Sequence, residues 1–147
     1  MTAHLLAVAI DAPLRRLFDY RCPPGVDAAS VQPGQRVWVP FGRRKAVGIV
    51  VEKRAHSDLP EAKLRNALAL IDEQPVVDAV LLDLLRWASE YYRHPVGEVF
   101  AAALPAALRT GADALQTSER WVISVAARTG TLPPLGTRAS KLREMAA

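Results

Sequence analysis

The chain has 147 residues, half of them hydrophobic, which suits one ordinary domain or a small domain plus part of another and excludes global disorder. Its single cysteine, Cys22, excludes an internal disulfide and a zinc site built on several thiolates. The net charge of +4 arises mainly in residues 1–57, which contain nine basic and four acidic side chains. This positive excess indicates either a surface that binds a polyanion or an arginine-rich surface that is only solvated.

The apolar run at residues 5–10 is followed at once by Asp11, so it lacks the order of a signal peptide. No apolar run approaches the roughly 18 residues of a membrane span. We therefore expect a cytoplasmic protein that does not enter a membrane.

The first half of the chain predicts short strands joined by turns. The candidate strands are residues 4–10, 17–22, 36–41, 46–53 and 66–71. In the third of them, Val37, Val39 and Phe41 alternate with Arg36, Trp38 and Pro40, which predicts two distinct faces. Residues 42–45, Gly-Arg-Arg-Lys, form a basic hairpin loop between two of these strands. Several short strands of this kind favour a small, strongly curved β-barrel similar to an OB-fold.

The hydrophobic period then changes to that of a helix. Asp78 is a suitable N-cap, and apolar residues recur at helical spacing up to residue 93, before His94-Pro95. A shorter helix is expected over residues 96–103. The sequence therefore predicts an α+β fold in which one long and one short helix pack on the barrel. On the long helix, Trp87, Ala88, Tyr91 and Tyr92 are expected to face partly inward, with at least one tyrosine substantially buried.

The predicted domain boundary lies where Gly, Asp, Gln, Thr and Ser cluster. Residues 1–109 would form the first domain and residues 110–120 a linker. Residues 121–147 would open a second domain, because the helix expected at 137–147 reaches the last residue without a cap.

Enzymatic functions are poorly supported by the sequence. The glycine-led loop at residues 42–45 lacks the spacing and the Lys-Ser/Thr pair of an ATP-binding phosphate loop. The histidines, His4, His56 and His94, have no metal-ligand spacing. We expect no catalytic residue, no metal and no cofactor in this chain.

Nucleic-acid binding fits the residues better. Small barrels bind strands through aromatic stacking and basic contacts to phosphate. The aromatic candidates are Phe18, Tyr20 and Trp38; Tyr20 is expected in the core, Trp38 is expected to be exposed, and Phe18 fits either place. The predicted phosphate contacts are Arg16, Arg36, Arg43, Arg44 and Lys45. Asp19 is either an ordinary surface acid or an acceptor for a terminal hydroxyl that would repel a terminal phosphate.

Several segments resemble the start of the primosomal protein N′ (PriA) family of bacterial replication-restart helicases. They are residues 16–20, 31–42, 48–51, 87–99 and 103–105, in matching order over about residues 4–109. The resemblance implies a domain that captures the 3′-hydroxyl end of the nascent leading strand at a stalled fork. It also implies that residues 121–147 open a winged-helix domain. Helicase lobes with ATP, magnesium and zinc sites would follow only in the full-length parent.

The resemblance also implies a site and partners. The family's end-binding pocket carries over to the pair Phe18 and Asp19, to Gly42, and to Arg65, where the family often has lysine. The expected partners are forked or 3′-tailed DNA and, through the parent, primosome proteins and single-strand-binding protein; a monomer is expected. The alternative is a basic protein-interaction module that docks an acidic partner tail.

Overall fold

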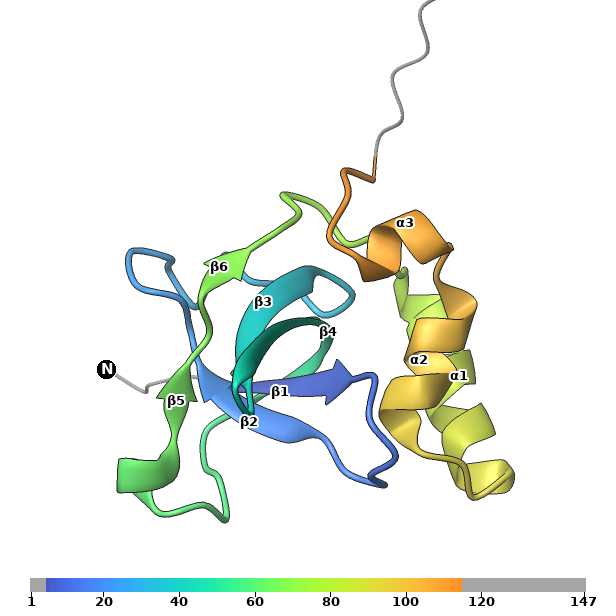
Figure 1. Ribbon diagram of the computed structural model, residues 1–147, viewed down its shortest axis with the longest axis horizontal. Helices are drawn as coiled ribbons and strands as arrows, with labels where there is room; N and C mark the ends of the chain where they lie inside the picture. The colour runs from blue at the N-terminus through green and yellow to red at the C-terminus, as the bar shows by residue number, and fades with distance from the viewer. Residues whose placement is uncertain (1–4, 115–147) are drawn as a thin grey trace, which may run out of the picture. The chain divides into compact units, whose positions relative to one another are not determined.

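The computed structural model describes residues 5–114, which form a curled six-stranded sheet with helices packed on one side (Figure 1). The strands are β1 (Leu5–Ile10), β2 (Phe18–Arg21), β3 (Arg36–Phe41), β4 (Arg44–Arg54), β5 (Arg65–Asn66) and β6 (Ala69–Leu70). The α-helices are α1 (Ala79–Tyr91), α2 (Val96–Ala103) and the short α3 (Ala106–Arg109), and a short 3₁₀ helix, η1 (Glu61–Lys63), lies between β4 and β5. The predicted α+β class and curved barrel are confirmed, as a curled half-barrel. The predicted second domain, 121–147, and part of the predicted linker, 110–120, lie outside the described residues.

The strand order explains the curvature of the sheet. The order is β5-β2-β1-β4-β3-β6, and all neighbours are antiparallel except β2 and β5. β5 and β6 are separated by only two residues, yet they pair with strands at opposite ends of this order. The segment predicted as one strand at 66–71 is therefore two short strands that bridge the two edges of the sheet.

The hairpin between β3 and β4 is tight because of Gly42. Phe41 pairs with Arg44, so only Gly42 and Arg43 form the loop. Gly42 has a φ of 61°, as the first central residue of a type II′ turn requires, and glycine adopts this conformation without steric cost. The turn therefore places Gly42 and Arg43 at the tip of the hairpin, whereas Arg44 and Lys45, which were predicted in the loop, are the first residues of β4.

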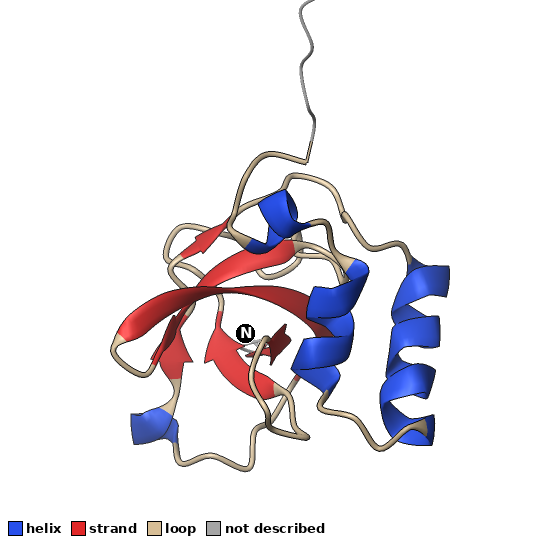
Figure 2. Cartoon of the chain, turned by 45° about the vertical axis from the view of Figure 1, so that its right-hand side comes forward, coloured by secondary structure: helices blue, strands red, loops and turns tan. Residues whose placement is uncertain are grey.

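Two hydrophobic clusters stabilise the domain. The first fills the barrel with alternate side chains of β1, β3 and β4, including Leu6, Val37 and Val39. The helices lie against the outer face of the sheet (Figure 2). The second cluster lies between that face and the helices and includes Phe100 of α2. β1 is buried on both faces because it contributes to both clusters. The predicted inward direction of Val37 and Val39 is confirmed.

Helix α1 has the predicted cap but not the predicted inward face. The Asp78 carboxylate accepts a hydrogen bond from the Leu81 amide at 2.8 Å. The helix packs through Leu82 and Leu85. The exposed fractions are 53% for Trp87, 66% for Tyr91 and 70% for Tyr92, so the prediction that at least one tyrosine is substantially buried is wrong. Of the four residues predicted to face partly inward, Ala88 is the one that is partly buried. Apolar residues occur around most of this helix, and periodicity alone therefore did not identify the packed face.

Gly97 sets how closely α2 approaches β1. A Cβ atom at this position would overlap the Ile10 carbonyl, which is backbone and has little freedom to move. We expect Gly97→Ala to lower the free energy of unfolding by about 1–3 kcal/mol, the usual cost of overpacking. The measurement is urea unfolding, with Ala102→Ser on the exposed face of α2 as the matched control. Equal stability of the two variants would contradict the close packing of α2 on β1.

Candidate nucleic-acid interface

An open pocket of about 210 Å³ lies beside the β3–β4 hairpin. Phe18 and Asp19 reach it from β2, Gly42 from the hairpin turn, and Arg65 from β5. The structure thus brings together the four residues that were predicted from the sequence to bind the 3′ end of a DNA strand. The pocket is also lined by Tyr20, Pro40, Phe41, Leu59 and Lys63.

The apolar wall of the pocket is a pair of phenylalanines. Phe18 contacts Phe41 edge-to-face, with ring centroids 5.2 Å apart and an interplanar angle of 83°. The Arg16 guanidinium lies 5.1 Å from the centroid of the Phe18 ring. Phe18 is partly buried against the barrel core, so it serves the core and the pocket at once. The wall therefore combines an aromatic surface with a nearby positive charge.

Tyr20 supports the pocket from below. Its side chain is buried, as predicted, and its hydroxyl donates to the Pro40 carbonyl at 3.0 Å. Burial raises the pKa of Tyr20, although the nearby charge of Arg65 acts in the opposite direction. Tyr20 therefore remains a neutral donor at physiological pH and ties β2 to the end of β3.

Asp19 is held in place by two partners. Its side chain is 10% exposed. Arg54 Nη1 lies 3.3 Å from Oδ1, and the Ser57 hydroxyl donates to Oδ2 at 2.5 Å. Each carboxylate oxygen can still accept a further hydrogen bond, because a carboxylate has about four acceptor positions. The arrangement fixes the direction of the acceptor, while Arg54 offsets part of its negative charge.

Arg54 connects this acid to helix α1. Arg54 Nη2 lies 2.6 Å from Glu52 Oε1, and Arg86 Nη1 of α1 lies 3.3 Å from Glu52 Oε2. Burial would lower the pKa of Arg54, but the hydrogen bonds and charges of Glu52 and Asp19 outweigh it, so that pKa is raised. Arg54 and Ser57 were not recognised from the sequence, because both lie far along the chain from Asp19.

The cationic side of the pocket includes a residue that the sequence analysis missed. Arg65 is exposed and pairs in register with Tyr20 across the parallel β2–β5 contact. Lys63, two residues earlier, also lines the pocket and is exposed. The loop between β4 and β5 carries no hydrophobic period, so only the fold places Lys63 here. Around Gly42 the pocket is open, since a Cβ atom there would meet nothing within 4 Å.

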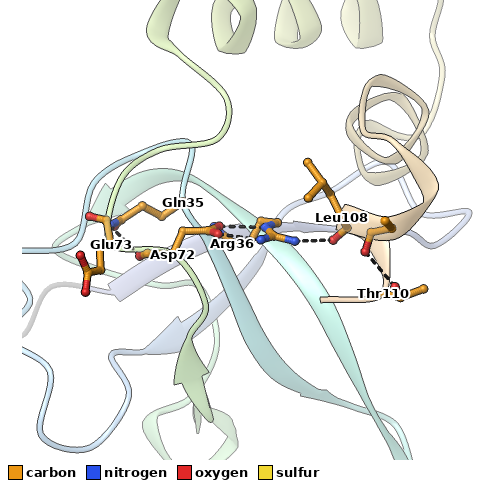
Figure 3. A network of polar contacts seen from close by, with 7 residues as sticks. Gln35, Arg36, Asp72, Glu73, Leu108 and Thr110 are labelled. Atoms are coloured by element: carbon orange, nitrogen blue, oxygen red, sulfur yellow. Dashed lines mark hydrogen bonds and ion pairs between the residues drawn. The ribbon is translucent and has the colours of Figure 1, made fainter. Parts of the chain in front are cut away.

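The predicted phosphate contacts separate into exposed and buried residues. Arg16, Arg43, Arg44 and Lys45 are exposed and available to a ligand. For Arg36 the prediction of a phosphate contact is wrong, because its side chain is fully buried and cannot reach a DNA phosphate. Its guanidinium binds Asp72 through Nε at 2.8 Å and Nη2 at 2.6 Å, and its Nη1 donates to the Leu108 carbonyl at 2.7 Å (Figure 3).

Within residues 5–114, no cluster of three or more His, Cys, Asp and Glu side chains has the geometry to hold a metal ion. His94 instead lies 2.9 Å from the Glu98 carboxylate, one turn away. In the same described range, no helix has the length and apolar content needed to cross a membrane.

Fold and pocket together define a small-barrel nucleic-acid-binding domain, with an aromatic and cationic pocket beside a basic hairpin. The family model described as the 3′ DNA-binding domain (3′BD) of PriA matches residues 7–105. The chain therefore belongs to the PriA 3′ DNA-binding domain family.

Curated relatives agree with this assignment. Replication restart protein PriA of Haemophilus influenzae is 41% identical over 125 residues, which are 84% of this chain and 17% of that protein. PriA of Bacillus subtilis is 35% identical over 94 residues, 64% of this chain and 12% of that protein. PriA of Synechocystis is 33% identical over 127 residues, 79% of this chain and 13% of that protein. The chain thus spans less than a fifth of the length of these relatives.

Proposed function

We propose that the pocket between β2, β5 and the β3–β4 hairpin holds the terminal nucleotide of a DNA strand, and that Asp19 accepts a hydrogen bond from its free 3′-hydroxyl. The observation that supports this most is the convergence of Phe18, Asp19, Gly42 and Arg65 on one open pocket from three parts of the fold. A fixed carboxylate beside cations and an aromatic wall matches the chemistry of a nucleotide with a free hydroxyl.

Each side of the pocket has a role in this proposal. Phe18 offers an apolar surface to the sugar or base, and such contacts tolerate any of the four bases. Gly42 presents backbone without a side chain, so the strand can approach closely. Arg65 and Lys63 neutralise the phosphate next to the terminal nucleotide, which makes the affinity dependent on salt.

For the longer protein, we propose the activity that the name of the relatives indicates, replication restart. There, this domain would present the 3′ end of the nascent leading strand at a forked or 3′-tailed DNA. Helicase lobes with ATP, magnesium and zinc sites, together with primosome proteins and single-strand-binding protein, would act through other parts of that protein. In this proposal the present domain is a non-catalytic, cytoplasmic monomer.

The proposed function is tested by comparing DNA ends. We expect a tailed duplex with a 3′-hydroxyl to bind at least ten-fold more tightly than the same duplex with a 3′-phosphate, because a phosphate would bring two anions together at Asp19. Fluorescence anisotropy at one salt concentration measures both. The competing function, an interaction module for an acidic protein tail, requires little difference between the two ends. A non-specific DNA binder would also bind both ends alike and lose both with salt.

A further inference from the structure

A second depression, of about 260 Å³, lies on the other side of the hairpin that borders the terminal-nucleotide pocket. Three of its lining side chains are cationic: Arg44, Lys45 and Arg109. Asp11 is the single acid among its lining residues, which leaves a clear positive excess. Nothing in the proposed function uses Arg109 or this depression.

The cations of this depression are positioned by local contacts. The Lys45 ammonium lies 4.4 Å from the centroid of the Trp38 ring, which faces the same side of the hairpin. The other support of the ring is the turn at Gly111, whose φ of 86° lets the backbone lie so close that a Cβ atom would overlap the indole. Trp38 is thus a platform that orients Lys45 rather than a free stacking surface.

Arg109 is positioned from the opposite side by the buried network of β3. Arg36 Nη1 donates to the carbonyl of Leu108, the residue before Arg109, and the Thr110 hydroxyl donates to the Ala107 carbonyl at 2.8 Å (Figure 3). These bonds hold the end of α3 over β3, so that Arg109 reaches the same depression as Lys45. Two cations from distant parts of the chain therefore converge on one place.

We infer that this depression binds the backbone phosphates of the nucleotides that precede the terminal one on the same DNA strand. The inference rests on the proposed function of the terminal pocket. It follows from continuity: Phe41 and Gly42 line the first pocket, while Trp38 and Lys45 of the same hairpin line the second. Trp38 precedes Phe41 by three residues, which is about 10 Å along a strand, and the two side chains point to opposite faces of β3, so the DNA strand passes around the hairpin between the two pockets. An extended single strand covers that distance within a few nucleotides.

The test compares short and longer DNA in two matched double variants. Lys45→Gln with Arg109→Gln removes two charges from the depression and keeps most of each side-chain stem. Arg15→Gln with Arg93→Gln removes two charges from another exposed depression, which those arginines line with His94. Each protein is titrated with a 3′-hydroxyl dinucleotide and a 3′-hydroxyl hexanucleotide over a range of salt concentrations.

We expect the first double variant to bind the hexanucleotide at least ten-fold more weakly and the dinucleotide within two-fold of the unmodified protein. The slope of log affinity against log salt should fall by about 1.4 for the hexanucleotide, or about 0.7 per phosphate contact on a single strand. A neutral methylphosphonate at the second or third linkage from the 3′ end should weaken binding by the unmodified protein but not by this variant. The control variant should differ from the unmodified protein in none of these measurements.

The inference is overturned if the first double variant binds the hexanucleotide normally, if the control variant loses as much, or if the dinucleotide is weakened equally. These results are independent of the proposed function, which fails separately if the unmodified protein does not prefer a 3′-hydroxyl over a 3′-phosphate.

Discussion

Replacing Asp72 by alanine is expected to lower the free energy of unfolding by about 3–5 kcal/mol, the cost of leaving one partner of a buried ion pair alone. Arg36 is fully buried, and Asp72 binds both its guanidinium and, through Oδ2, its backbone amide at 3.0 Å. Without the carboxylate, the charge of Arg36 has no compensation inside the domain. Urea unfolding followed by circular dichroism measures the change.

The chain offers a matched control for this prediction. Arg21 and Glu61 also form an ion pair, at 3.4 Å, but the Glu61 side chain is 90% exposed. Glu61→Ala should therefore change stability by less than about 1 kcal/mol. If Asp72→Ala cost no more than Glu61→Ala, water would have to reach Arg36, and the buried network could not be what holds α3 over β3.

Replacing Asp19 by alanine is expected to weaken binding to 3′-hydroxyl ends by about ten- to a hundred-fold. A hydrogen bond to a charged acceptor contributes about 1.5–3 kcal/mol, which corresponds to that range of affinity. Binding to 3′-phosphate ends should fall less or rise, so the difference between the two ends narrows. Anisotropy titrations of both ends against both proteins measure this, with circular dichroism as the test of folding.

DNA whose terminal nucleotide lacks the 3′-hydroxyl separates the effect of the hydrogen bond to Asp19 from the effect of its negative charge. Removing the hydroxyl from the DNA should weaken binding by the unmodified protein as much as Asp19→Ala does, and the two changes together should cost little more than either alone. Asp19→Ala leaves Arg54 without the carboxylate of this ion pair, but the Arg54 side chain is partly exposed and can be solvated, so the variant is expected to fold. If Asp19→Ala still bound 3′-hydroxyl ends as much more tightly than 3′-phosphate ends as the unmodified protein does, the preference would instead come from steric exclusion of the phosphate near Gly42.

The buried network also explains why one sequence prediction was wrong. Strand alternation correctly placed Arg36 on the same face as Trp38, opposite Val37 and Val39. That face is covered at Arg36 by α3 and by the segment that contains Asp72, while the hairpin end of the same face stays open. Alternation indicates which side chains share a face, but it does not indicate which end of the face is covered by distant segments.

Helix α1 illustrates the same limit. Its length, its cap at Asp78 and its apolar content were predictable from local sequence, because capping and periodicity are local properties. The choice of Leu82 and Leu85 for packing, and the exposure of Trp87, depended on how the helix meets β4 and α2. A helix that is apolar on several faces gives no local reason to prefer one.

The sequence by itself determined the α+β class, the curved barrel, the presence of a hairpin at Gly42 and, through family resemblance, the residues of the proposed pocket. These depend on period, turn chemistry and motif order, which are local along the chain. Only the tertiary structure placed Arg54 and Ser57 on Asp19, buried Arg36 against Asp72, and brought Arg109 beside Lys45. Those contacts join residues about 35 to 65 positions apart along the chain; they exist because closure of the barrel and docking of the helices bring remote segments together, and no local pattern encodes that.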